Sequence, residues 1–131
     1  VNWIAYHNNC ENEELFIIED KVSKKVIGHI GLYNIDLRVK SAEYAILIGN
    51  NEYIGRGVGR KVTGLILQYA FKELKLNRIY LSLISENLSA YNLYLKMGFK
   101  KEGCLRQSIL KKENYYDSIL MALLKKEYDE K

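Results

Sequence analysis

The chain has 131 residues, of which 48% are hydrophobic and 27% charged, and it carries a formal net charge of +4. This size and composition are typical of one soluble globular domain with a core of its own. The lysines are spread along the sequence, which disfavours a nucleic-acid partner but suits an anionic ligand. No apolar run reaches about 18 residues, so no membrane partner is expected. Cys10 and Cys104 have neither CxxC nor metal-ligand spacing, which argues against a disulfide framework or a metal site and favours a reduced, cytoplasmic location.

The first part of the chain is expected to contain three strands. Residues 1–8 have the pattern of the tail of a helix, and residues 15–18 and 26–35 have the pattern of strands. Residues 41–49 form the third strand, whose side chains alternate between two faces that are both largely apolar. This pattern is typical of a central strand covered on both sides. One face holds Tyr44, Ile46 and Ile48, and the other holds Glu43, Ala45 and Leu47.

The most informative stretch is the glycine-rich segment at residues 53–60, Tyr-Ile-Gly-Arg-Gly-Val-Gly-Arg. Because glycine lacks a Cβ, it lets backbone N–H groups turn toward a ligand and approach it closely. The helix that follows adds its unpaired N–H groups and the positive end of its dipole, and arginines can pair phosphate oxygens. The segment therefore predicts a pyrophosphate site, and the alternative is a glycine-rich turn without a ligand. Its glycines and arginines are Gly55, Arg56, Gly57, Gly59 and Arg60.

Residues 57–74 carry the clearest helical pattern of the chain. Apolar residues recur there at steps of three and four and form one stripe that faces the core. Gly64 lies inside this helix and costs about 1 kcal/mol relative to alanine, so packing must hold the helix. The stripe consists of Val58, Val62, Leu65, Ile66 and Tyr69.

The rest of the chain is expected to form a strand, a short helix and two closing strands. Residues 78–84 alternate in the manner of a strand. Asn87 is a candidate N-cap and Gly98 a C-terminal stop, and together they bracket a helix at residues 88–97. Residues 99–111 and 115–124 then form strands joined by a polar turn at 112–114. This order predicts a mixed α/β architecture, one sheet with helices on its faces.

The segment at residues 87–99, Asn-Leu-Ser-Ala-Tyr-Asn-Leu-Tyr-Leu-Lys-Met-Gly-Phe, resembles the N-x-x-A/S-x-x-x-Y-x-K-x-G-F signature of the GCN5-related N-acetyltransferase (GNAT) superfamily. In that superfamily a preceding loop of the form Q/R-x-x-G-x-G/A binds the pyrophosphate of acetyl-CoA. Here the loop is residues 54–59, with Ile54 where many members have Gln or Arg. The tail at residues 101–106 and 115–121 is similar to the branch that acetylates ribosomal-protein N-termini, polyamines and amino sugars. The resemblance extends over residues 14–126.

The resemblance implies the GNAT fold of acyl-CoA N-acyltransferases, a single mixed and mostly antiparallel central sheet with helices on both faces. Residues 1–131 would form a single N-acetyltransferase domain. Family members begin with a further strand and helix region that often shapes the acceptor pocket. Most of that region is expected to be absent or cut short here, so the domain is expected to be incomplete at its N-terminus.

The resemblance also implies acetyl-CoA as cosubstrate and a set of residues that bind it. Backbone N–H groups of the glycine loop would hold the pyrophosphate. The end of the third strand, around Ile48, would pair with the pantetheine arm and offer an N–H group to the thioester oxygen. Asn87 would hydrogen-bond the same arm, a role compatible with capping a helix. The expected cofactor-binding residues are Ile48, Gly55, Arg56, Gly57, Val58, Gly59, Arg60 and Asn87.

Tyr94 matches the general acid of the family, which delivers a proton to the departing CoA thiolate. A phenol with a pKa of about 10 can protonate a thiolate where both groups are desolvated. The alternative is an ordinary core tyrosine, since the chain contains 11 tyrosines. The place of Tyr94 between Asn87 and Gly98 favours the general acid.

The general base is less sharply indicated by the sequence. An amine with a pKa of about 10 is roughly a thousandfold disfavoured as the free base at pH 7, so a group or a water chain must take its proton. Glu43 is the first candidate, because it lies on the central strand on the face opposite Tyr44. The alternative for this residue is an exposed glutamate at a strand end. His29 is a weaker candidate, and Asp36 and Glu86 are weaker still.

The function expected from these residues is direct acetyl transfer, in a ternary complex, from acetyl-CoA to a primary amine. The acceptor is left open between a protein N-terminus, an amino sugar and a polyamine. The tail favours the first two, and the charge of +4 argues mildly against a polycation. Two other classes remain: a catalytically degenerate CoA-binding module and a dinucleotide-binding protein, the latter disfavoured by the G-x-G-x-G spacing. A homodimer is left open.

Overall fold

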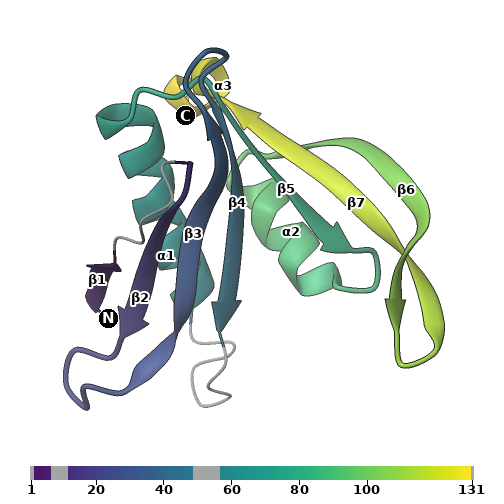
Figure 1. Cartoon of the computed structure of the whole chain (residues 1–131), viewed down its shortest axis with the longest axis horizontal. Coiled ribbons are helices and arrows are strands. Elements are labelled where there is room, and N and C mark those ends of the chain that lie inside the picture. The colour runs from purple at the N-terminus through teal and green to yellow at the C-terminus, as the bar shows by residue number, and fades with distance from the viewer. Residues whose placement is uncertain (1, 7–11, 49–56, 131) are drawn as a thin grey trace.

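The protein is a seven-stranded sheet with its helices packed against it (Figure 1). The computed structural model describes residues 2–6, 12–48 and 57–130, and it describes residues 2–6 and 48 by their backbone alone. The strands lie side by side in the order β1-β2-β3-β4-β5-β7-β6. The elements are β1 (Asn2–Tyr6), β2 (Glu14–Glu19), β3 (Val26–Asp36), β4 (Ser41–Ile48), α1 (Val58–Gln68), η2 (Tyr69–Glu73), β5 (Arg78–Ile84), α2 (Leu88–Lys96), β6 (Lys100–Lys111), β7 (Asn114–Leu124) and α3 (Lys125–Asp129).

The sheet divides between β4 and β5. All other neighbouring strands are antiparallel, whereas β4 and β5 are parallel and pair over three residue pairs, the last of which is Glu43 with Tyr80. Beyond that pair β4 continues along β3 and β5 continues along β7, and Figure 1 shows the two strands diverging. We call the point at Glu43 and Tyr80 the fork. Because each half of the sheet keeps its own antiparallel partner, the strands can separate there without loss of the remaining ladders.

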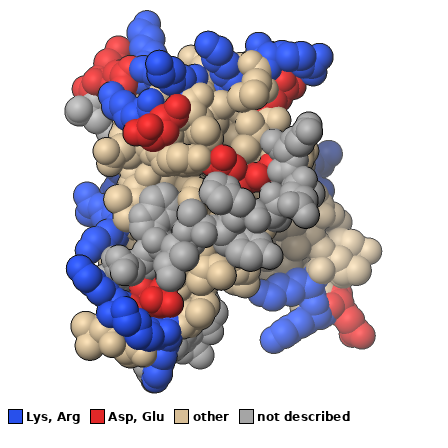
Figure 2. Space-filling model, turned by 60° about the vertical axis from the view of Figure 1, so that its left-hand side comes forward, with Lys and Arg blue, Asp and Glu red and all other residues tan. Residues whose placement is uncertain are grey.

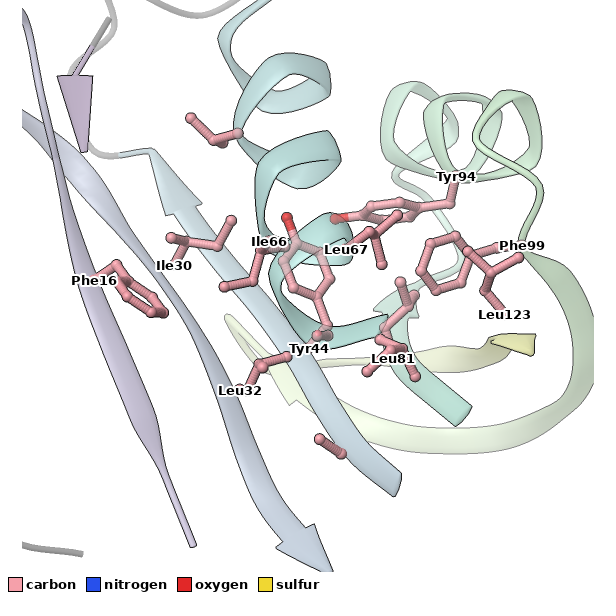
Figure 3. Close-up of a cluster of buried hydrophobic side chains, with 14 of the residues drawn as sticks. Phe16, Ile30, Leu32, Tyr44, Ile66, Leu67, Leu81, Tyr94, Phe99 and Leu123 are labelled. Carbon is pink, nitrogen blue, oxygen red and sulfur yellow. The ribbon is translucent and has the colours of Figure 1, made fainter. Parts of the chain in front are cut away.

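One hydrophobic core lies between the sheet and the helices. Side chains from β2 to β5, from β7 and from both α1 and α2 meet in a single buried cluster (Figure 3). Tyr44 of β4 lies in its middle, with the helices α1 and α2 on its side of the sheet. The fully buried members with the largest side chains are Phe71, Phe99, Ile18, Ile27, Ile30, Leu32, Ile66, Leu67, Leu76, Ile79, Met121 and Leu123.

The prediction of a helix tail at residues 1–8 was wrong, because residues 2–6 form strand β1. This strand pairs in antiparallel register with β2, from Asn2 opposite Glu19 to Tyr6 opposite Leu15. A stretch of five residues is too short for its own pattern to distinguish a helix end from a strand, and the partner strand decides.

The prediction that β4 is covered on both sides was also wrong for the described residues. Ala45 and Leu47 are exposed, and Leu47 keeps 57% of its surface accessible. A single alanine and a single leucine are common on protein surfaces, so their presence on that side was a weak indication of burial.

The predicted helix at residues 57–74 consists of α1 and one turn of π-helix, η2. The wider turn keeps Ala70 and Phe71 buried, while Tyr69 makes an edge contact with Phe16 of β2 at 5.6 Å between ring centroids. Of the predicted stripe, Val58, Val62 and Ile66 are buried, and Leu65 and Tyr69 are half-buried. Thr63 and Leu67, which lay outside the predicted stripe, are buried as well. The buried face is broader than one stripe because α1 meets both the sheet and α2.

Gly64→Ala is expected to stabilise the protein by about 0.5–1 kcal/mol, because alanine has the higher helix propensity. A Cβ at this position would have the Met97 Cε atom as its nearest neighbour, at an ordinary contact distance of 3.9 Å. The midpoint of thermal unfolding should rise by a few degrees. Gly31→Ala is the matched control and should lower it, because its Cβ would lie 2.7 Å from Leu15 Cδ2 and 3.1 Å from the Glu14 carbonyl oxygen. A lower midpoint for Gly64→Ala would contradict the prediction.

Candidate active site

The N-terminus of α1 can accept an anion. Gly57 is its N-cap residue, no side chain caps the helix, and its first turn contains no acidic residue. The N–H groups of Val58, Gly59 and Arg60 belong to the first turn, where an α-helix has no intrahelical acceptors. Arg60 is exposed beside them. Gly55 and Arg56 lie outside the described residues. The described half of the predicted pyrophosphate site therefore fits a phosphate group.

Gly57 has a backbone conformation that favours glycine. Its φ is +76°, in the left-handed region, and its carbonyl oxygen accepts a hydrogen bond from the Lys61 N–H at 3.1 Å. A Cβ at Gly57 would have no atom within 4 Å, so the space around it is open and the backbone angle alone restricts the residue. Gly57 is therefore suited to be the residue from which α1 begins.

Gly57→Ala is expected to destabilise the fold by about 1 kcal/mol, because an L-residue is strained at this positive φ. Thermal unfolding of the variant would measure the loss. Gly103→Ala is the control, because a Cβ there meets only an ordinary contact, Leu120 Cδ1 at 3.9 Å, and Gly103 has no positive φ. The prediction fails if the two variants unfold at the same temperature.

Helix α2 places Tyr94 in the core. Asn87 caps this helix as predicted, its Oδ1 atom accepting a hydrogen bond from the Ala90 N–H at 3.1 Å, and Gly98 ends it with φ +102°. Tyr94 is 7% exposed, and its ring lies 5.5 Å from that of Phe99. Burial raises the pKa of Tyr94 above its ordinary value. The phenol therefore stays protonated through the neutral range.

Tyr44 faces Tyr94 from the sheet. It is the residue of β4 directly after the fork, and the two rings meet edge to face with centroids 6.1 Å apart. The hydroxyl groups of the two tyrosines point toward one another and are hydrogen-bonded (Figure 3). The Tyr44 hydroxyl also hydrogen-bonds Thr63 Oγ1 of α1 at 2.5 Å. Burial, the largest cause, raises the pKa of Tyr44 well above its ordinary value.

The sequence did not predict this hydroxyl cluster, which we define as Thr63, Tyr44 and Tyr94. The one signal available was the position of Thr63 in α1, between Val62 and Gly64 and three residues before Ile66, where a polar side chain borders the apolar stripe. A threonine there is also compatible with an exposed position, so the pattern did not decide.

Glu43 lies at the fork on the other face of the sheet. It is half-buried, and its Oε1 atom accepts a hydrogen bond from Asn34 Nδ2 at 3.0 Å. It pairs with Tyr80 across the last rung between β4 and β5, and its charge adds to burial in raising the pKa of Tyr80. The fork thus has a phenol, Tyr94, on the helix side and a carboxylate on the opposite side.

The weaker candidates for the base lie elsewhere. His29 is exposed on β3, opposite Leu47. Asp36 is held by Arg38, which lowers the pKa of this carboxyl through hydrogen bonds from its side chain and its backbone. Glu86 is exposed at the end of β5, in a pocket of about 480 Å³ that also contains Asn87. The other residues lining this pocket are Ile84, Lys111, Lys112 and Tyr116.

Charged side chains are mixed on the face seen in Figure 2. Lys and Arg lie mainly toward its margins, with acidic side chains among them. Among the described residues, no three His, Cys, Asp or Glu side chains are grouped so that they could hold a metal ion. In the same part of the chain, no helix is long and apolar enough to cross a membrane.

Known proteins resemble this chain in sequence and in fold. A family model described as an acetyltransferase (GNAT) domain matches residues 2–120. The spermidine N(1)-acetyltransferase of Vibrio cholerae is 35% identical over 93% of this chain and 68% of its own length. That of Escherichia coli K12 is 30% identical over 93% of this chain and 64% of its own length. The solved structure of spermidine/spermine N-acetyltransferase SpeG from Vibrio cholerae matches with a TM-score of 0.86 and 34% identity, covering 93% of this chain and 71% of that chain.

The chain belongs to the GNAT acetyltransferase family, and it is an acetyl-CoA-dependent N-acetyltransferase. The predicted fold class, enzyme class and cosubstrate are thereby confirmed. The chain spans about two thirds of the length of the spermidine acetyltransferases that it matches. The assignment to the branch that acetylates ribosomal-protein N-termini stays a prediction.

Proposed function

We propose that this enzyme transfers the acetyl group of acetyl-CoA directly to a primary amine of a polyamine, within a ternary complex. The observation that carries the proposal is the fork. It places the buried Tyr94 phenol on the helix side of the sheet and the Glu43 carboxylate on the opposite side, at the point where β4 and β5 separate. An acid and a base held apart in this way suit a reaction that protonates one group and deprotonates another.

In this proposal the pyrophosphate of acetyl-CoA is held by backbone N–H groups of residues 55–60 and by Arg56 and Arg60. The positive end of the α1 dipole and its uncapped first turn support this placement. The backbone of β4 near Ile48 pairs with the pantetheine arm, and Asn87 contacts the same arm from the start of α2. The thioester supplies an activated acetyl group, and the chain positions it between the two halves of the sheet.

Glu43 attracts the cationic acceptor and takes a proton from its amine, directly or through a water molecule. The amine nitrogen then forms a bond to the acetyl carbon, and the bond from that carbon to sulfur breaks. Tyr94 gives its proton to the CoA thiolate, so that the products are the acetylated amine and CoA in its thiol form. The nitrogen loses its second proton to solvent as the amide forms, Tyr94 regains a proton from solvent, and Glu43 releases one to it, so that the overall reaction of the cationic amine releases one proton.

The acceptor is proposed from the relatives and from the local charge. Two relatives of this chain carry the name spermidine N(1)-acetyltransferase. The net charge of +4 belongs to the whole chain, whereas the fork presents a carboxylate, Glu43. Local carboxylates govern the approach of a small cation more strongly than distant lysines, because salt screens charges more than about 10 Å apart.

Thiol release from acetyl-CoA tests the proposal, with spermidine, glucosamine and a short peptide with a free N-terminus compared at equal concentrations. Spermidine should give the highest kcat/KM. A higher value for the peptide or the amino sugar would overturn the polyamine assignment and leave the enzyme class intact. If acetyl-CoA raises the midpoint of thermal unfolding and none of the amines releases thiol, the chain is a CoA-binding module. Acetyl-CoA at a hundred times its dissociation constant should raise the free energy of unfolding by about 2.7 kcal/mol.

A further inference from the structure

We propose that Tyr44, supported by Thr63, is a positioning residue for Tyr94. In this arrangement Tyr44 donates a hydrogen bond to the Tyr94 oxygen, directs the Tyr94 proton toward the leaving thiolate and stabilises the phenolate that remains after the proton has left. This inference rests on the proposed function, in which Tyr94 is the general acid. It assigns a role to two residues outside the set that the family signature contains.

The geometry of the hydroxyl cluster supports this role. Thr63 comes from α1, Tyr44 from β4 and Tyr94 from α2, so three separate elements bring their hydroxyl groups to one place. Their side chains are almost inaccessible to solvent, with exposed fractions of 0% for Thr63, 2% for Tyr44 and 7% for Tyr94. Water therefore competes little for these hydrogen bonds, and a bond to a charged oxygen is strong in such surroundings.

Only one order of donors and acceptors in the cluster leaves the Tyr94 proton available for the thiolate. Each hydroxyl carries one proton and can also accept hydrogen bonds. If Thr63 donates to Tyr44 and Tyr44 donates to Tyr94, the Tyr94 proton has no partner within the cluster and is free for the thiolate. In the reverse direction the Tyr94 hydroxyl would donate its hydrogen bond to Tyr44 and would not have it available for the thiolate. Either hydroxyl can be the donor in the hydrogen bond between Tyr44 and Thr63, so the first direction is open to the cluster.

The position of Tyr44 relative to the fork gives the cluster its relevance to the reaction. Tyr44 follows Glu43 in β4, so it is the first residue of that strand without a pairing partner on β5. Ring packing between Tyr44 and Tyr94 needs no hydroxyl, because a phenylalanine would make the same edge-to-face contact. The second hydroxyl at the fork therefore has a role beyond filling the core. No proton passes between the two tyrosines in this proposal, and Tyr44 stays protonated throughout.

The test is a set of variants measured by thiol release with spermidine at saturating acetyl-CoA. Tyr44→Phe should lower kcat about tenfold with little change in the KM for acetyl-CoA, because it removes a hydrogen bond to a group that becomes charged. Thr63→Val should lower kcat by a smaller factor. Thr63→Ser should keep the kcat of the parent enzyme, because serine retains the hydroxyl group. Thermal unfolding in parallel reports whether each variant is folded, and the two threonine variants carry the test if Tyr44→Phe does not fold.

A double-mutant cycle separates a positioning role from a structural one. In the Tyr94→Phe background, Tyr44→Phe should change kcat by less than about twofold, because the acid on which it acts is gone. A full further tenfold loss in that background would overturn the inference, as would wild-type kcat in Tyr44→Phe. If Tyr94→Phe lowers kcat and Tyr44→Phe does not, only this inference fails. If Tyr94→Phe keeps its activity, or the parent protein acetylates no amine, the proposed function fails and this inference fails with it.

Discussion

Tyr94→Phe is expected to lower kcat about 100-fold while the KM for acetyl-CoA changes by less than about twofold. Without the phenol the CoA thiolate must leave unprotonated or take its proton from water, whereas the contacts that bind acetyl-CoA remain. Burial raises the pKa of Tyr94 above its ordinary value, so the acid form persists at all pH values below that raised pKa. The parent enzyme should therefore show no loss of kcat from this group as the pH rises from 7 to 9.

The control for this variant is Tyr91→Phe. Tyr91 lies one turn earlier in α2 and is half-buried, and it packs against the same core without belonging to the hydroxyl cluster. It should keep kcat within about twofold of the parent. Equal kcat values for Tyr94→Phe and the parent enzyme would remove Tyr94 from the mechanism.

Glu43→Gln is expected to lower kcat/KM for the amine between about tenfold and 100-fold at pH 7. Glutamine retains the shape of the side chain and an oxygen that can accept the hydrogen bond from Asn34 Nδ2. It neither takes a proton nor attracts a cation. Because an amine with a pKa of about 10 exists mainly as the cation at pH 7, the loss of the base should be greatest there.

The loss of kcat/KM in Glu43→Gln should become smaller as the pH rises. As the pH rises from 7 to 9, the free-base fraction of the amine increases about 100-fold, so the deficit of Glu43→Gln should narrow. His29→Gln is the comparison, since His29 is the next candidate for the base and is exposed on β3, and this variant should keep its activity. A larger loss for His29→Gln than for Glu43→Gln, or a deficit that stays constant with pH, would remove Glu43 from the role of base.

Several features of the protein followed from short stretches of sequence. The strands β2 to β5, the cap of α2 by Asn87 and the end of that helix before Gly98 agree with the predictions. These features depend on patterns that extend over only a few residues: alternation with period two, helical spacing and the residue preferences of caps. Such patterns can be recognised directly in the sequence. The family signature at residues 87–99 likewise lies within one helix and its ends.

The sequence therefore determined the family and the order of most elements, and it supplied the candidate residues for binding acetyl-CoA. Only the tertiary structure decided that residues 2–6 pair as a strand, that β4 and β5 part after Glu43 and Tyr80, and that Tyr44 meets Thr63 and Tyr94. Tyr44 and Thr63 are 19 positions apart in the chain, one on a strand and the other on a helix. Local patterns contain no information about such partners, because strand pairing and helix packing are settled by which distant surfaces bury one another best.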